Sequence, residues 1–209
     1  MANPLSLPGD LIVPGTLRLT GSISPTKDKA DVLAIAEDSV FTIPWTLWRT
    51  WDSLGTNLPS AAATDDLGLV GGTFGTASPS IQGQDFGGGS TTAYARAQIP
   101  MPWNYVSSGG VTLRFHAGML TTIADDYCKL DVNCYETDEE AGISADICYT
   151  AEQSINSLVL ADVDFVITDT ALVAGDLLDV RIKVYGNDVG DAGVMIPIIG
   201  AVQLLCDVR

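Results

Sequence analysis

The stretch Leu172–Tyr185, LVAGDLLDVRIKVY, determines the expected fold, because a turn signal at Gly175-Asp176 is followed by strictly alternating side chains. The apolar face carries Leu178, Val180, Ile182 and Val184, and the other face carries Asp179, Arg181, Lys183 and Tyr185. Alternation with period two over eight residues is typical of a half-buried antiparallel strand. The stretch therefore predicts a strand with one face in a core.

A second alternating run lies just upstream, where Val163, Phe165 and Ile167 share one face. Two such strands joined by a short polar turn predict a hairpin, and its apolar face must be buried against a second sheet. Further runs at residues 67–74, 91–99, 111–119 and 127–135 predict strands, with shorter ones near Ile147 and Val159. About eight strands without crossover helices predict an all-β protein, a jelly-roll-like antiparallel β-sandwich.

The last run, residues 194–208, is apolar on both faces. Met195, Ile199 and Leu205 oppose Ile196, Ile198, Val202 and Leu204. A strand that is apolar on both faces lies at the centre of a sheet or under a subunit interface. Because Pro197 argues against an uninterrupted central ladder, we expect an interface formed by Met195, Ile199 and Leu205. The predicted partner is a second copy, most simply in a trimer.

Residues 1–51 differ from the remainder because prolines and glycines interrupt them every few residues. The segment is too small to bury a core of its own, yet it is too apolar for a solvated tail. It is therefore predicted to be an extended N-terminal arm, ordered on a partner's surface and attached to a body at 52–209. The apolar residues expected to bind that partner are Leu11, Ile12, Val13, Leu17, Leu19 and Ile23.

The arm ends in Pro44–Trp51, PWTLWRTW, where Trp45, Trp48 and Trp51 recur every three residues. Pro44 suits the first turn of a helix, and a tight helical turn would place the three rings on one stripe. Three uses of such a stripe stay open: packing against the sandwich, anchoring to another protein, or a platform for sugars. We include the three tryptophans among the expected partner-binding residues.

The charge excludes some partners. The chain has 209 residues and a net charge of −16, with only 10 basic residues. Residues 1–51 hold four basic and five acidic groups, about −1, whereas residues 52–209 hold six and 21, or −15. Nucleic acid and anionic membranes are unfavourable partners, because binding phosphates needs clustered Lys and Arg. No apolar run approaches 18 residues, and MANPLSLPGD lacks the features of a secretory signal, so we expect synthesis in the cytoplasm.

Residues with catalytic or metal-binding potential are few. Cys128 and Cys134 lie six residues apart on one predicted strand, about 20 Å, which is beyond disulfide or shared-metal reach. Reduced core cysteines are expected, although Cys148 or Cys206 on a neighbouring strand could pair with one of them. The single histidine, His116, points outward and has neither a second metal ligand nor a nucleophile motif nearby. We expect no metal, no cofactor and no catalytic residue.

Two weaker possibilities remain from acidic residues. The carboxylate groups Asp65-Asp66, Asp125-Asp126 and Asp138-Glu139-Glu140 could serve a glycosidase, in which one carboxyl must be buried enough to stay protonated. Because they lie in polar, turn-like stretches, we expect them to form a solvated rim instead. Asn187, Asp188 and Asp191 could hold Ca²⁺, although a hairpin turn explains them equally well.

Three stretches, at residues 10–25, 44–76 and 151–182, resemble a known family of virion proteins. The first, DLIVPGTLRLTGSISP, resembles arm segments of tailed-bacteriophage virion proteins, and the other two are similar to the jelly-roll bodies attached to such arms. The family is that of the capsid decoration, or cement, proteins, β-sandwich trimers whose arms reach across neighbouring shell subunits. The resemblance implies a structural protein on the capsid exterior that binds the major capsid protein. It implies no catalytic residue.

Three hypotheses follow. The first is a capsid decoration protein anchored by its arm. The second is a receptor- or carbohydrate-binding virion protein of the tail, with the tryptophans as a sugar platform. The third, a carboxylate glycosidase, has the least support. A sugar binder should expose the tryptophans in a groove, whereas a decoration protein should bury them under protein contacts.

Overall fold

The structure, a computed structural model, describes residues 37–85, 89–107, 109–121, 127–137, 142–168, 172–188 and 194–208. The chain divides into two compact units, Met1–Ile35 and Ala36–Arg209, and the described residues belong to the second. The predicted arm residues Leu11 to Ile23 lie outside the described residues. Within the described part, no helix has the length and apolar character needed to cross a bilayer.

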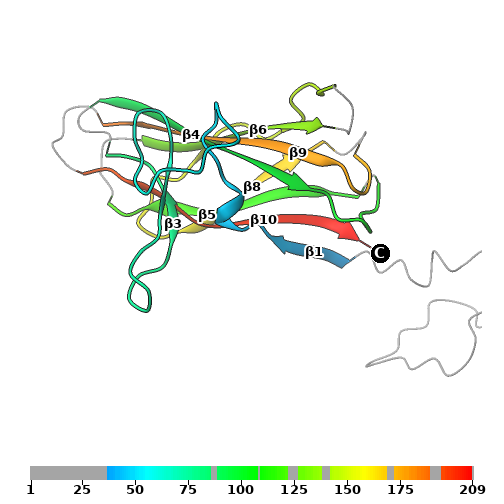
Figure 1. Ribbon diagram of the computed structural model, residues 1–209, viewed down its shortest axis with the longest axis horizontal. Coiled ribbons are helices and arrows are strands. Elements are labelled where there is room, and N and C mark those ends of the chain that lie inside the picture. The colour runs from blue at the N-terminus through cyan, green and yellow to red at the C-terminus, as the bar shows by residue number, and fades with distance from the viewer. Residues whose placement is uncertain are drawn as a thin grey trace, which may run out of the picture. The chain divides into compact units, whose positions relative to one another are not determined.

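The described residues of the body form ten strands and one short helix (Figure 1). The strands are β1 (Glu37–Thr42), β2 (Gly68–Val70), β3 (Ser80–Gln82), β4 (Ser90–Pro100), β5 (Val111–Met119), β6 (Tyr127–Thr137), β7 (Gln153–Ser154), β8 (Ala161–Ile167), β9 (Leu177–Asn187) and β10 (Pro197–Val208). The 3-10 helix η1 spans Trp45–Leu47. All the strand pairs are antiparallel.

The strands form two sheets packed face to face. The four-stranded sheet has the order β4-β9-β6-β7, and the six-stranded sheet has the order β2-β3-β10-β5-β8, with β1 also paired to β10. Four pairings are nested in the sequence: β6 with β7, β5 with β8, β4 with β9, and β1 with β10. A doubled ribbon rolled up in this way is a jelly roll, with β2 and β3 as an insertion between β1 and β4. The predicted jelly-roll-like antiparallel sandwich is confirmed.

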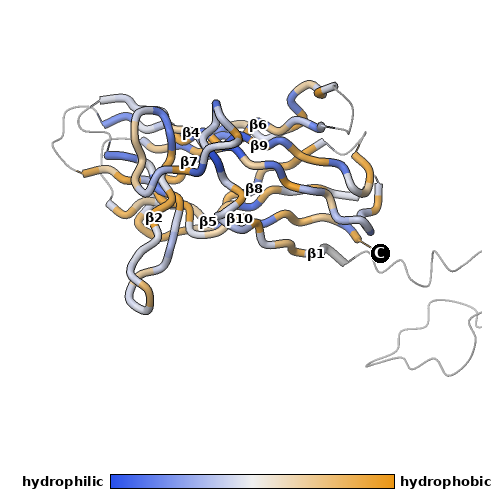
Figure 2. Tube along the Cα trace, in the orientation of Figure 1, coloured by the Kyte–Doolittle hydropathy of each residue, from blue (hydrophilic) through white to orange (hydrophobic). Residues whose placement is uncertain are grey.

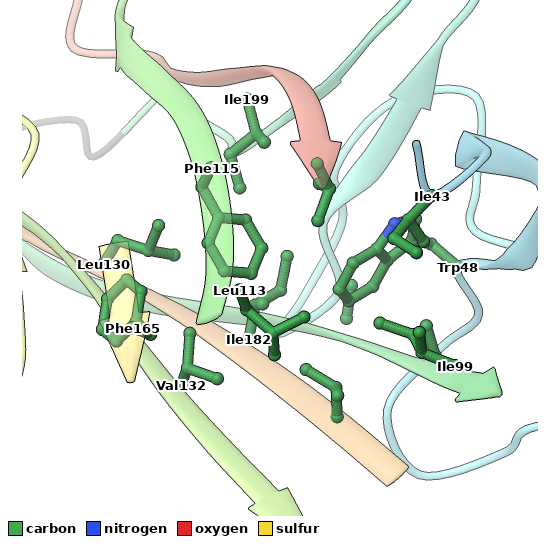
Figure 3. Packing of buried hydrophobic residues seen from close by; sticks show 14 of the residues in the cluster. Ile43, Trp48, Ile99, Leu113, Phe115, Leu130, Val132, Phe165, Ile182 and Ile199 are labelled. Carbon is green, nitrogen blue, oxygen red and sulfur yellow. The ribbon is translucent and has the colours of Figure 1, made fainter. Parts of the chain in front are cut away.

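The core lies between the sheets and follows from the alternation of side chains along the strands (Figure 2). Strand β5 buries Val111, Leu113, Phe115, Ala117 and Met119, the set that the sequence predicted. Phe115 and Phe165 pack edge to face with ring centroids 5.7 Å apart, and Trp48 lies 6.4 Å from Phe115 (Figure 3). Aromatic pairs at such distances add to the apolar area that the core buries.

The boundary predicted at residue 51 is wrong, because the body begins with β1. Residues 37–42 pair along their whole length with β10, from Glu37 opposite Val208 to Thr42 opposite Gln203. Without β1 the jelly roll would lack its first strand. Residues 37–51 therefore belong to the sandwich rather than to an arm.

The hairpin predicted from the two alternating runs is also wrong. Strand β8 pairs with β5 in the six-stranded sheet, whereas β9 lies between β4 and β6 in the other sheet. The turn at Gly175 instead carries the chain from one sheet to the other. Both apolar faces still meet in the core, because each strand turns its buried side toward the opposite sheet.

The two-faced pattern of residues 194–208 results from a β-bulge in β10. The register against β5 shifts between Ile199 and Ala201, so the buried set changes from odd to even positions. Met195 and Ile199 are buried before the shift, and Val202 and Leu204 are buried after it. The prediction of an oligomer interface is therefore wrong for Met195 and Ile199, which fill the chain's own core. Leu205 lies half-buried on the outer face, beside the exposed Val40.

The four cysteines are free thiols, and Cys128, Cys134 and Cys206 are buried. Burial raises the pKa of the Cys128 thiol to about 12 and that of Cys206 to about 11, because the core disfavours the thiolate. We therefore expect these thiols to react very slowly with a disulfide reagent at pH 8, since the thiolate is the nucleophile. The measurement is a thiol titration with and without 8 M urea. Rapid reaction of all four thiols without urea would contradict the buried assignment.

Candidate functional site

The outer face of the four-stranded sheet carries the densest group of aromatic and polar side chains among the described residues. Alternate residues of β4, β9 and β6 point away from the core and align in rows across the sheet. The rows are Thr92–Tyr185–Lys129, Tyr94–Lys183–Asp131, Arg96–Arg181–Asn133 and Gln98–Asp179–Tyr135. Each row follows from register, because directly opposed residues of antiparallel strands share a face.

The first aromatic cluster consists of Trp51, Tyr94 and Arg181. The rings of Trp51 and Tyr94 lie 5.1 Å apart, and the indole Nε1 of Trp51 donates a hydrogen bond of 3.0 Å to Asp65. The Arg181 guanidinium lies over both rings, 5.8 Å from Trp51 and 5.4 Å from Tyr94. This geometry is that of a cation–π contact, which fixes the orientation of all three side chains.

The loop that carries Trp51 is held to the edge of β4. The backbone of Arg49 exchanges two hydrogen bonds with Arg96, of 2.8 and 3.0 Å, and Tyr94 exchanges backbone bonds with Asp65 and Leu67. Burial raises the pKa of Asp66, and the neighbouring Asp65 adds to the rise. Trp51 lies on the sheet because the backbone before it, at Arg49, and the backbone after it, at Asp65 and Leu67, both hydrogen-bond to the edge of β4.

The second aromatic cluster, Tyr127 and Tyr185, lies farther along β9. The two rings are 5.6 Å apart, and the Tyr127 hydroxyl donates a hydrogen bond of 3.1 Å to the Tyr185 hydroxyl. The ammonium of Lys129 lies 5.4 Å from the centre of the Tyr127 ring. Arg181 and Tyr185 are four residues apart on one strand, so the two clusters are separated by about 13 Å.

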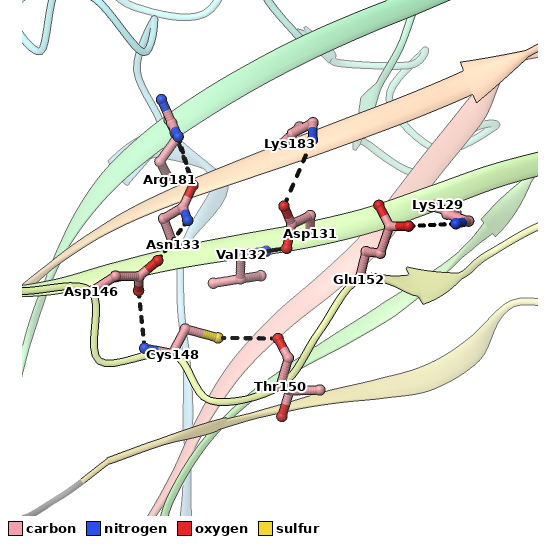
Figure 4. A network of polar contacts seen from close by, with 10 residues as sticks. All are labelled: Lys129, Asp131, Val132, Asn133, Asp146, Cys148, Thr150, Glu152, Arg181 and Lys183. Atoms are coloured by element: carbon pink, nitrogen blue, oxygen red, sulfur yellow. Dashed lines mark hydrogen bonds and ion pairs between the residues drawn. The ribbon is translucent and has the colours of Figure 1, made fainter.

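Charged and amide side chains of β9 and β6, with Glu152 beside them, form a network of polar contacts on this face (Figure 4). The Lys183 ammonium lies 3.8 Å from Asp131, and Lys129 forms an ion pair with Glu152. The Arg96 guanidinium donates two hydrogen bonds to the carboxylate of the buried Asp179. The Lys129 ammonium lowers the pKa of Glu152, so this carboxyl stays ionised. The face therefore offers hydrogen-bond donors and acceptors that are held in place by their partners.

Arg181 hydrogen-bonds to a neutral amide, whereas the basic side chains of the ion pairs just described bind carboxylates. Its guanidinium donates to the amide oxygen of Asn133, at 2.6 Å from Nη2 and 3.3 Å from Nε. The amide nitrogen of Asn133 donates a hydrogen bond to Oδ2 of Asp146 (Figure 4). Oδ1 of Asp146 accepts hydrogen bonds of 3.0 Å from the backbone N–H groups of Cys134 and Cys148. A guanidinium has five N–H donors, and the bonds to Asn133 use two of them.

Basic charge is concentrated on this side of an acidic protein. The structure describes six basic side chains, and five lie on or beside the face, namely Arg49, Arg96, Lys129, Arg181 and Lys183. The sixth, Arg114, belongs to the outer face of the other sheet and binds Asp164 through two bonds of 2.7 Å. The four-stranded face is therefore locally close to neutral in a chain of net charge −16.

The outer face of the six-stranded sheet carries a smaller polar group. Arg114, His116, Asp162, Ala201 and Gln203 surround a shallow hollow of about 180 Å³. His116 Nδ1 lies 2.9 Å from Asp162, as expected for an outward-facing histidine in an ion-pair network. Among the described residues, no cluster of three or more His, Cys, Asp or Glu side chains could hold a metal ion. Asp188 is buried, and Asp191 and the acidic runs at 125–126 and 138–140 lie outside the described residues.

The three predicted tryptophans do not form one stripe. The helix ends at Leu47, and the extended backbone of Trp48 turns its indole into the core, where 1% of the residue is exposed. Trp45 packs against the core from its edge, and Trp51 lies on the sheet face described above. Trp48 therefore cannot bind a partner, and packing is its role. The sequence did place part of the face, namely Tyr94, Arg96 and Gln98 on one polar strand side and Asp179, Arg181, Lys183 and Tyr185 on another. It named none of the outward residues of β6.

Comparisons with known proteins concern the fold. No family model matches the chain, and no curated protein matches it. The solved xylan-binding module CBM15 is 11% identical over 81% of this chain and 97% of that chain, with a TM-score of 0.42. A CBM22-1 xylan-binding domain from Paenibacillus barcinonensis Xyn10C is 10% identical over 84% and 100% of the two chains, with a TM-score of 0.38. CBM27-1 of Caldicellulosiruptor saccharolyticus, in complex with mannohexaose, is 8% identical over 80% and 97%, also with a TM-score of 0.38.

Proposed function

We propose that the protein binds carbohydrate chains without acting on them, through the outer face of the four-stranded sheet. The observation that carries this proposal is the pair of aromatic clusters on a face filled with fixed hydrogen-bond donors and acceptors. A sugar ring presents apolar C–H groups on its faces and hydroxyls around its rim. Aromatic side chains suit the first, and amides, carboxylates and basic groups suit the second.

The spacing of the clusters fits an extended ligand. A chain lying along β9 would meet the Trp51–Tyr94 cluster and, about 13 Å farther on, the Tyr127–Tyr185 pair. Between the clusters it would pass Lys183 and Asp131, which can bond to hydroxyls without the cost of ordering themselves. A short oligosaccharide is long enough to contact both clusters.

A binding role suits this face better than hydrolysis does. A glycosidase needs one carboxyl whose pKa is raised so that it can give a proton to the leaving group. On this face the Lys129 ammonium lowers the pKa of Glu152, which favours the carboxylate over the acid. Asp66, whose pKa is raised by burial, lies in the loop beside β4 rather than among the side chains that point outward from the strands.

The test is calorimetric titration with soluble xylan and mannan oligosaccharides, after a screen on a glycan array. Replacing Tyr185 by alanine should weaken binding by about 30-fold, since removing an aromatic anchor commonly costs about 2 kcal/mol. Tyr185→Phe should retain most of the affinity, because it keeps the ring. The matched control is His116→Ala on the opposite sheet, where no change is expected. Absence of glycan binding by the unaltered protein, or equal losses in both alanine variants, would overturn the proposal.

A second candidate function is capsid decoration, and the sequence resemblance supports it. Residues 1–36 precede β1, and β1 pairs with β10 on one side only, so the chain enters the body at a sheet edge. Co-sedimentation of the full chain with stripped capsids, compared with a variant lacking residues 1–36, tests this role. Equal binding by both would contradict an arm-based attachment to the major capsid protein.

A further inference from the structure

The loop between β2 and β3 is an uncharged projection with an aromatic ring at its tip. Residues 71–79, GGTFGTASP, extend from the body below β2 and β3 (Figures 1 and 2). Phe74 is fully exposed there, so its ring contributes nothing to the core. We call residues 71–79 the Phe74 loop.

The Phe74 loop has a defined turn. The Thr73 carbonyl accepts backbone bonds of 2.9 Å from both Thr76 and Ala77. Gly72 and Gly75 adopt φ values of +66° and +79°, which glycine takes without strain. A Cβ at Gly72 would come within 2.6 Å of the Ala77 carbonyl oxygen, so this close turn requires glycine. The ring is thus held outward by the loop's own geometry.

Two apolar hollows border Pro44, next to the end of β1, and both are lined by Thr42, Ile43 and Pro44. One, of about 320 Å³, is also lined by Leu47, Met101 and Trp103, and the other, of about 510 Å³, by Trp45, Ala201 and Val202. Trp103 is 85% exposed at its rim. We call the two hollows together the Pro44 groove.

The Phe74 loop and the Pro44 groove are both uncharged. Neither the residues of the Phe74 loop nor the residues lining the Pro44 groove include an acidic or basic side chain. Elsewhere the body is strongly acidic, with a net charge of −15 over residues 52–209, so two copies repel each other over most approaches. A contact between the loop of one copy and the groove of another brings no carboxylates together. Interface anchors are typically large side chains that fill well-packed pockets from which water is excluded.

We propose that Phe74 of one copy inserts into the Pro44 groove of a second copy. The contact joins two different surfaces, so each copy keeps a free loop or groove for a further partner. Such heterologous contacts close into a ring when the rotation between copies allows it. This contact replaces the oligomer interface expected from Met195 and Ile199, and it uses none of the residues proposed to bind carbohydrate.

The test is sedimentation of the full chain at 1–100 µM, with variants of each surface. Phe74→Ser removes the anchor, and the double variant Thr46→Glu, Leu47→Glu places two carboxylates in the groove. Each should weaken self-association by about 30-fold or more. The matched control is Tyr149→Ser, which removes another largely exposed aromatic ring elsewhere and should leave the assembly unchanged. The three variants change only residues on the surface, so the circular dichroism spectrum of each should match that of the unaltered protein.

Mixing the two defective variants distinguishes this contact from any symmetric one. The intact groove of Phe74→Ser should accept the intact loop of the Thr46→Glu, Leu47→Glu variant, so the mixture should sediment as a complex of two chains. A single-chain mass for the unaltered protein at 100 µM would overturn the proposal. An assembly that survives Phe74→Ser, or a mixture that stays monomeric, would overturn it equally.

Discussion

Replacing Trp48 by alanine is expected to lower the free energy of unfolding by about 3–5 kcal/mol. The indole is 1% exposed and packs among Ile43, Ile99 and Phe115 at the centre of the sandwich (Figure 3). Its Nε1 has no hydrogen-bond partner among the described residues, so the loss comes from packing and from the cavity left behind. Urea unfolding followed by far-ultraviolet circular dichroism measures the change.

The matched control is Trp103→Ala, which removes the same side chain from the surface. Because Trp103 is 85% exposed, the free energy of unfolding should change by less than about 0.5 kcal/mol. A Trp48→Ala variant as stable as Trp103→Ala would show that Trp48 is not in the core. The comparison also separates the two tryptophans functionally, because only Trp103 remains available to a partner.

Alternation along single strands was predictable, and for a clear physical reason. The faces of residues 111–119, 127–134 and 178–184 turn inward as the sequence indicates, because one side of each strand meets the core and the other meets water. Alternation does not report which strand lies next to which. The runs at 163–167 and 178–184 look like a hairpin, yet they occupy different sheets.

Strand β1 illustrates a second limit of reasoning from sequence. Its residues, EDSVFT, include Phe41 packed against the core and Val40 exposed on the outer face, so the strand carries little pattern of its own. It is ordered by pairing with β10, more than 160 positions later in the chain. A contact over that separation leaves no local signature. The bulge in β10 also leaves no local signature. Because the buried positions change from odd to even at the bulge, the sequence of this strand looks apolar on both faces.

The candidate face was predictable in pieces and not as a unit. The sequence placed Tyr94 and Arg96 on one polar side and Arg181, Lys183 and Tyr185 on another. That these sides are adjacent follows only from the pairing of β4 with β9. Trp51 joins them because its loop runs along β4, whereas its spacing from Trp48 suggested a shared helical stripe. Register across strands, rather than spacing along the chain, assembles the site.

The second large effect is expected from two deletions that differ by only seven residues. A chain lacking residues 1–36 should unfold with nearly the same free energy as the full chain, because all ten strands and the core remain. A chain lacking residues 1–43 loses β1 and the buried Ile43, whose N–H donates to Val202 at 2.9 Å. Burying one isoleucine contributes about 1.5–3 kcal/mol and each ladder hydrogen bond about 1 kcal/mol.

The longer deletion should therefore cost about 5 kcal/mol or more, which is comparable to the whole stability of many domains. It also uncovers the edge of β10 along residues 203–208, and an open apolar edge promotes aggregation. We expect the chain lacking residues 1–36 to be soluble and cooperative in thermal unfolding, and the chain lacking residues 1–43 to be insoluble or to melt far lower. Equal melting temperatures would show that β1 is not part of the body, and the boundary would then return to residue 51. A loss of folding in both chains would instead mean that the jelly roll depends on residues before β1.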